Sequence, residues 1–172
     1  LRLSMKGGVE LHTHFVGESS LTVTSEPFPQ NRNEDWPVVM KSAYGGGTIT
    51  LLCADIFSYP GAEAISFPRA FLENALSAGG KPSSVGVISS NTAIPSILKK
   101  LGIAAETLTY EAVKSTGLSQ FDALVIGSST TAAEDRILFD FGGRINDFIS
   151  RGGDVLAVAA PSLPWLIRGT DK

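Results

Sequence analysis

The residues best suited to chemistry are one cysteine and two histidines. Cys53 is the single cysteine of the chain, and His12 and His14 are its two histidines. A thiolate paired with an imidazole is a nucleophile for acyl transfer, so Cys53 with His12 or His14 is a candidate catalytic pair. However, a long loop follows Cys53, whereas a helix N-terminus placed there would lower the pKa of the thiol. We therefore expect Cys53 to be a small apolar side chain of the core.

The two histidines also suggest a metal site. Glu10, His12 and His14 alternate with apolar residues over 8–16, so the period of two places them on one face of a strand. Two imidazoles and a carboxylate are ligands for first-row metals. No fourth ligand is evident, so a solvent-facing strand is the simpler interpretation, and no metal or cofactor is predicted.

Several polar side chains directly follow apolar, strand-like runs. They are Asp55, Ser89, Asn91, Ser128, Ser129 and Thr130. The carboxyl ends of parallel strands are where open α/β folds bind ligands. Backbone N–H groups at the helix starts, together with these hydroxyls, suit an anion or a sugar hydroxyl. Ordinary helix capping is the alternative for both serine-rich loops. We predict a small-molecule or sugar site here.

Composition narrows the classes of partner. The 172 residues are 43% hydrophobic and 18% charged, which fits one globular domain with a sizeable core. A net charge of −3 and a pI near 5.4 lack the basic footprint of a nucleic-acid-binding protein. No apolar run reaches the length that spans a bilayer, and we expect no signal peptide at residues 1–8. The cellular location stays open.

The first half of the chain predicts antiparallel strands. Period-two alternation and apolar runs place strands at 8–16, 20–25, 37–44 and 48–56. The first two are expected to form a hairpin, and the polar, proline-rich residues 26–37, with Trp36, a loop. Gly45-Gly46-Gly47 is expected to be a hairpin turn. A helix is predicted over 67–77, with Ser66 as its N-cap.

The second half predicts alternating strands and helices, after a candidate linker at 79–84. The strands are 85–88, 104–109, 122–127 and 154–160, and the helices begin near Asn91 or Thr92 and at the capping box Thr131 to Glu134. A short connection or helical turn is expected at 111–119, and Gly142-Gly143 is expected to bend or break the last helix. The fold class is therefore a three-layer α/β fold with a mostly parallel sheet and an antiparallel N-terminal part.

Three segments of the second half resemble one known family. VGVISSNTAIPSILKKLGI, FDALVIGSST and INDFISRGGDVLAV are similar to the first half of the class I glutamine amidotransferase-like superfamily, a flavodoxin-like α/β fold. They cover residues 84–161. SAYGGGTITLLCADIF and FPRAFLENALSAGG resemble the second half of its trehalose-utilisation-like and β-galactosidase trimerisation-like branches, so that 8–78 takes that role. The resemblance implies one permuted domain over 1–172, or else an excerpt across two tandem domains.

The resemblance also bears on catalysis. Catalytic members carry a cysteine in the turn after the strand that follows the Gly-Gly pair. Matching DVLAVAAPS to that strand puts Ala159 at the cysteine position, with Ala160 next and Pro161 where glycine is usual. Alanine has no nucleophile, and proline lacks the N–H that an oxyanion hole needs. The resemblance thus implies a domain without this acyl-transfer site.

Three functions are compatible with these patterns. The first is a non-catalytic binding or assembly module in a carbohydrate-related setting, with a homo-oligomer as a candidate assembly. The alternative is a cysteine-dependent hydrolase or amidotransferase that uses Cys53 with His12 or His14. The third is an interface protein whose β-hairpin pairs with a partner.

Overall fold

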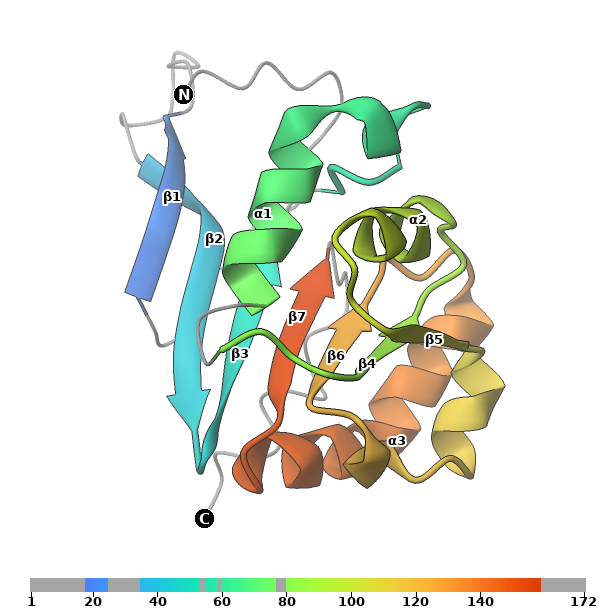
Figure 1. The fold of residues 1–172 in the computed structure, drawn as a ribbon. Coiled ribbons are helices and arrows are strands. Elements are labelled where there is room, and N and C mark those ends of the chain that lie inside the picture. Colours follow the sequence, from blue (N-terminus) through green and yellow to red (C-terminus); the bar gives the residue numbers. More distant parts are fainter. Residues whose placement is uncertain (1–17, 25–34, 53–54, 59, 77–79, 159–172) are drawn as a thin grey trace.

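The computed structural model describes residues 18–24, 35–52, 55–58, 60–76 and 80–158. Their strands are β1 (Glu18–Thr24), β2 (Asp35–Tyr44), β3 (Gly47–Leu52), β4 (Val85–Ile88), β5 (Ala105–Leu108), β6 (Ala123–Ile126) and β7 (Asp154–Val158). Their helices are α1 (Ser66–Leu76), α2 (Ala93–Lys100) and α3 (Ala132–Ser150), with short 3-10 turns η1 (Ala62–Ala64), η2 (Tyr110–Lys114) and η3 (Leu118–Gln120). The arrangement is shown in Figure 1.

All described strands belong to one mixed sheet. Its order is β1-β2-β3-β7-β6-β4-β5. Strand β2 is antiparallel to both of its neighbours, β1 and β3, and the five strands β3, β7, β6, β4 and β5 are parallel. Counted along the chain from β4 and ending with β3, the parallel strands lie in the order 2-1-3-4-5. That order is the one of flavodoxin-like doubly wound sheets. The predicted mostly parallel α/β class is confirmed.

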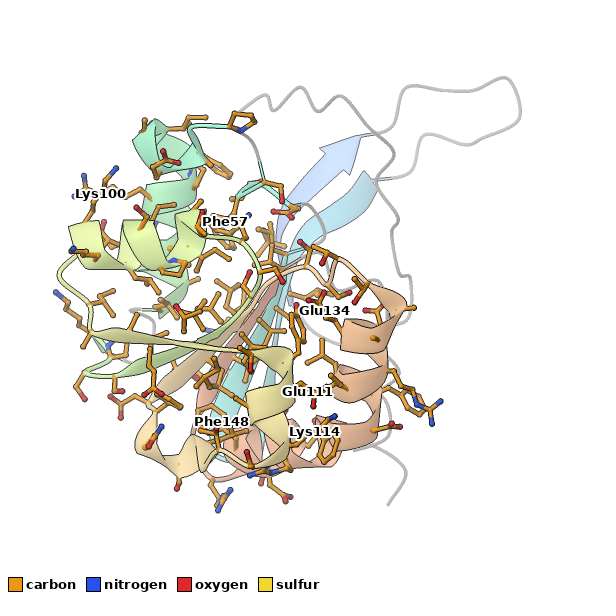
Figure 2. The ribbon with its side chains drawn as sticks, turned by 90° about the vertical axis from the view of Figure 1, so that its right-hand side faces the viewer. Phe57, Lys100, Glu111, Lys114, Glu134 and Phe148 are labelled. Carbon is orange, nitrogen blue, oxygen red and sulfur yellow. The ribbon has the colours of Figure 1, made fainter. Side chains whose placement is uncertain are left out.

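Helices cover both faces of the sheet, which gives three layers. Figure 2 shows α1 and α2 on one side and α3 on the other. Strand side chains alternate between the two cores: Val85 and Val87 pack with α1 and α2, whereas Ile88 packs with α3, η2 and η3. Because both faces are buried, the central strands are continuous apolar runs instead of alternating ones.

The two halves of the chain join along β3 and β7. The Thr48 backbone N–H and hydroxyl both donate to Asp154 Oδ1, at 3.1 and 2.6 Å. The hairpin turn before β3 lies close to the end of α3, where Gly46 N donates to Ser150 O at 3.0 Å. A Cβ on Gly47 would lie 2.1 Å from Gly153 O, so this contact requires glycine. The N-terminal β-rich part therefore completes the parallel sheet.

The start of the sheet differs from the prediction. β1 pairs with β2, and residues 8–16, its predicted partner, lie outside the described residues. Strand β2 contains the predicted strand 37–44 but begins at Asp35, so the predicted loop 26–37 was wrong for Asp35 and Trp36. Pro37 is tolerated because β2 pairs with β3 only from Val39 onward, so that among the described strands Pro37 has a partner only in β1, namely Thr22.

Three other boundaries also differ. The strand predicted over 48–56 does not include Asp55 and Ile56, which belong to a bend. In this bend the backbone N–H groups of Phe57 and Ser58 donate to the Asp55 carboxylate. Helix α1 begins at Ser66 itself, one residue before the predicted start. Helix α3 is continuous through Gly142-Gly143. Its flanking residues Leu138 and Ile145 are buried, and that packing outweighs the roughly 1 kcal/mol that each helical glycine costs.

The remaining elements agree with the patterns. Strands β4, β5 and β6 lie within the predicted ranges, and the capping box of Thr131 and Glu134 is formed. Residues 110–120 form two 3-10 turns, as the predicted short connection allows. Gly45 has a φ of 59° in the β2–β3 turn, a left-handed conformation that favours glycine.

Candidate ligand-binding site

The carboxyl ends of three parallel strands meet at one crevice. The loops after β3, β4 and β6 line a cavity of about 390 Å³. Its polar lining comprises Ser58, Ser90, Asn91, Thr92, Ser128 and Thr130. Phe57, Pro60 and Ala93 contribute apolar surface, and Glu63 from η1 contributes a carboxylate. A crevice of mixed polar and apolar lining in this position is the usual geometry of a small-molecule site in open α/β folds.

The Asp55 carboxylate connects two of these loops. Oδ2 accepts hydrogen bonds from Ser128 Oγ, at 2.5 Å, and from Ser58 Oγ. Oδ1 accepts from the backbone N–H groups of Phe57 and Ser58, both at 3.0 Å. Four donors thus converge on one carboxylate, which holds the bend after β3 and anchors it to the loop after β6.

The loop after β4 is held by its own side chains. The Oγ of buried Ser89 accepts from Asn91 N at 2.9 Å, and Asn91 Oδ1 accepts from Ala93 N at 2.8 Å. Asn91 Nδ2 is then directed to Ser58 Oγ, at 3.4 Å. Asn91 therefore caps the start of α2, while the residue in the N-cap position, Thr92, makes no such side-chain bond.

Close packing between the β4 and β6 loops requires a glycine. A Cβ on Gly127 would lie 2.1 Å from Ser89 Oγ and 2.7 Å from Ser89 Cβ. The carbonyl of Gly127 accepts a hydrogen bond from the buried Tyr110 hydroxyl at 3.2 Å. Burial, and then the charges of Glu134 and Asp135, raise the pKa of Tyr110 above its ordinary value, so this hydroxyl stays protonated.

A second carboxylate, Glu134, connects the β4 and β6 loops. Its Oε1 accepts from Ser90 Oγ at 3.0 Å. Its Oε2 accepts from Thr130 N at 2.6 Å, Thr130 Oγ1 at 3.0 Å and Thr131 N at 3.2 Å. Desolvation raises the pKa of Glu134, but these hydrogen bonds outweigh it and hold the pKa below its ordinary value. Glu134 is therefore ionised at neutral pH.

The helix-start donors that an anion would use are largely taken by this chain. At the start of α3, the backbone N–H groups of Thr130 and Thr131 donate to the Glu134 carboxylate, and that of Glu134 donates to Thr131 Oγ1. At the start of α2, the backbone N–H of Ala93 donates to Asn91 Oδ1. Among the described residues that line the crevice, none is Lys or Arg. Of the two ligand chemistries expected for these loops, the sugar hydroxyl thus has the better physical fit.

The structure separates the predicted site residues into two groups. Asn91, Ser128 and Thr130 line the crevice. Asp55 is not a lining residue, but its carboxylate accepts a hydrogen bond from Ser128. Ser89 holds its own loop, and Ser129 Oγ donates to Asp135 Oδ1. These last two side chains position the loops by hydrogen bonds within this chain.

Several residues of the site were not predicted, among them the lining residues Thr92 and Glu63. Ser58 stands beyond the predicted end of its strand, and Ser90 lies between two residues that were predicted. Glu134 was assigned only to the capping box, although it also reaches Ser90 on another loop. Strand-end position was the one sequence signal for Ser90; the long-range contact of Glu134 had no local signal.

The other candidates lie outside the described residues. They are Cys53, Glu10, His12, His14 and Ala159 with the residues after it. Among the residues that the structure does describe, no group of three His, Cys, Asp or Glu side chains is placed to hold a metal ion.

The chain matches no protein-family model and no curated protein. None of the helices in the described ranges combines the length and apolar character that crossing a membrane requires.

Proposed function

We propose that this chain is a non-catalytic, amidotransferase-like binding module whose crevice takes a sugar or a similar polyhydroxylated small molecule. The observation that carries the proposal is the convergence of three strand ends on one polar crevice, joined by the Ser128–Asp55 hydrogen bond of 2.5 Å. Sites of this kind fix a small ligand with a few placed polar groups beside apolar surface.

The lining suits a hydroxyl-rich ligand. Hydroxyl and amide groups stand at the crevice on Ser90, Asn91 and Ser128, and the exposed Pro60 offers apolar surface to the C–H face of a ring. The crevice volume of about 390 Å³ is within the range of small-molecule pockets. An anion finds no Lys or Arg among the described lining residues, which favours a ligand without negative charge.

The strand order supports the amidotransferase-like part of the proposal. The second half of the chain supplies β4 to β7, and the first half supplies β3 as the fifth parallel strand. A permuted domain joined near 79–84 gives this arrangement, and a contiguous sheet from both halves favours it over an excerpt of two separate domains. The carbohydrate setting comes from the family resemblance alone and remains part of the proposal.

The test is a titration with a panel of mono- and disaccharides, followed by calorimetry or ¹H–¹⁵N NMR. Saturable binding is expected, with Asn91→Ala and Ser128→Ala each weakening it several-fold, because each removes one polar contact of about 1 kcal/mol. Ser119→Ala, on η3 and away from the crevice, is the matched control. The proposal fails if no saccharide binds, or if both crevice variants bind as the parent does.

The cysteine-dependent alternative stays a prediction from the sequence, since Cys53, His12 and His14 are not among the described residues. A single substitution separates it from the binding module. Cys53→Ser is expected to leave saccharide binding unchanged. Rapid alkylation of the folded parent by iodoacetamide, together with an ester hydrolysis activity that Cys53→Ser abolishes, would favour the hydrolase instead.

A further inference from the structure

Two carboxylates accept hydrogen bonds from most of the hydroxyl groups that line the crevice. Ser58 Oγ and Ser128 Oγ both donate to Asp55 Oδ2, the latter at 2.5 Å. Ser90 Oγ donates to Glu134 Oε1 at 3.0 Å, and Thr130 Oγ1 donates to Glu134 Oε2 at 3.0 Å. An ionised carboxylate only accepts hydrogen bonds, so the direction of each bond is fixed.

A hydroxyl has one proton and two acceptor lone pairs. Once its proton is directed to a carboxylate, it can offer only lone pairs to a ligand. Among the described residues that line the crevice, four of the five hydroxyls are in this state, and Thr92 carries the fifth. The crevice is therefore a surface of hydrogen-bond acceptors, and it demands donors from whatever binds.

The charges around the crevice favour the same kind of ligand. Glu63 lines it, and Asp55 and Glu134 lie directly behind its hydroxyls. The neighbouring cation Lys100 does not line the crevice, and its Nζ donates to the Glu63 backbone carbonyl at 3.0 Å. Polarised by a carboxylate, each hydroxyl oxygen is also a stronger acceptor than an isolated hydroxyl.

We infer that the crevice selects a ligand that carries a protonated amine beside hydroxyl groups, such as an amino sugar, over the matching neutral sugar, and both over the matching sugar phosphate. The inference rests on the proposed binding function and names the chemical class of its ligand. An ammonium group has three donors and no acceptor, which matches the acceptor-rich lining. A phosphate has acceptors only and meets both lone pairs and negative charge.

Three probes of one scaffold test this selectivity: D-glucosamine, D-glucose and D-glucose 6-phosphate, each titrated by NMR at a pH where the amine is protonated. We expect glucosamine to bind roughly fivefold tighter than glucose, because charge-assisted hydrogen bonds are about twice as strong as neutral ones. Glucose 6-phosphate is expected to bind more weakly than glucose. Equal or tighter binding of glucose or of the phosphate than of glucosamine overturns the inference but leaves the binding function intact. Absence of binding by all probes and by the wider saccharide panel overturns both.

A charge-only variant provides the second arm. Glu63→Gln removes a lining charge with little change in shape, and within the described part of the chain the Glu63 carboxylate makes no hydrogen bond that the fold would lose. The preference for glucosamine over glucose is expected to fall about two- to threefold. Glu73→Gln on α1 makes the same charge change away from this crevice and is expected to keep the full preference. An unchanged preference in Glu63→Gln, or an equal fall in Glu73→Gln, contradicts the assigned role of the lining charge.

Discussion

Ser128 Oγ donates a 2.5 Å hydrogen bond to Asp55 Oδ2, across 73 residues of chain. This bond joins the loop after β6 to the bend after β3, which are supplied by the two halves of the sequence. The crevice thus exists only because both halves form one sheet, and its geometry depends on a carboxylate that four donors surround.

Replacing Asp55 should therefore loosen the site and the fold together. Asp55→Ala leaves Ser128 Oγ and the N–H groups of Phe57 and Ser58 without their acceptor, and we expect a loss of about 1–3 kcal/mol in the free energy of unfolding. Asp55→Asn keeps one acceptor oxygen and should lose about half as much. Urea unfolding measures both, and equal stability of the alanine variant and the parent would contradict the role given to Asp55.

Two glycines should respond to alanine in opposite ways. Gly127→Ala places a Cβ 2.1 Å from Ser89 Oγ, so we expect destabilisation by about 1–3 kcal/mol. Gly143→Ala adds a Cβ in open space on α3 and should stabilise by up to about 1 kcal/mol, because alanine is the better helix former. Thermal unfolding of both proteins is the measurement. The same sign of change in the two variants would show that the packing of the β4 and β6 loops is misjudged.

The Glu134 carboxylate should make stability depend on pH. Hydrogen bonds from Thr130, Ser90 and Thr131 outweigh desolvation and lower the pKa of Glu134 from its ordinary value of 4.5. A carboxyl whose pKa is lower in the folded state than in the unfolded state stabilises the folded state, and it does so fully at a pH above its unfolded-state pKa. This contribution disappears as the pH falls through the folded-state pKa. Glu134→Gln should therefore lower Tm at neutral pH, with the difference from the parent shrinking below about pH 4.5. A difference that stays constant down to acid pH argues against the ionised bridge.

Arg144 should matter more than an exposed arginine of the same helix. Its guanidinium donates to the carbonyls of Val113 and Thr116, at 2.7 Å for Thr116, and so ties the region of η2 to α3. Arg144→Met is expected to lose about 1–2 kcal/mol, with faster amide exchange in 110–118. Arg136→Met breaks an exposed ion pair with Asp140 and a cation–π contact with the Phe139 ring, and should lose less, about 0.5–1 kcal/mol. Equal losses in the free energy of unfolding of the two variants would contradict the role given to Arg144.

The sequence predicts most of the parallel layer because its signals are local. Apolar runs such as 85–88 and 122–127 report burial on both faces, and the Thr131 to Glu134 spacing reports a helix start. The pairing of β3 with β7 lacks such a signal, since it joins residues more than a hundred positions apart. The continuous α3 likewise depends on core contacts of Ile145, which outweigh the weak helix preference of the glycines.

The site residues also divide into those with a local sequence signal and those without one. Strand-end position was enough to predict Asn91, Ser128 and Thr130, because parallel strands bring their carboxyl ends to one edge. The cross-loop bonds from Ser58 to Asp55 and from Ser90 to Glu134 depend on how the loops pack. The direction of those bonds, and with it the acceptor character of the crevice, follows only once the partners are known.

The most direct test of the binding crevice is a ¹H–¹⁵N NMR titration of the assigned parent protein with D-glucosamine. We expect saturable shifts concentrated at the backbone amides of Ser58, Ser90, Asn91, Ser128 and Thr130, which lie at the ends of three strands. Amides near Ser119 and Gly152, at the opposite edge of the sheet, should stay unchanged. Shifts that leave the strand-end amides unmoved, or that gather at the opposite edge, would contradict it.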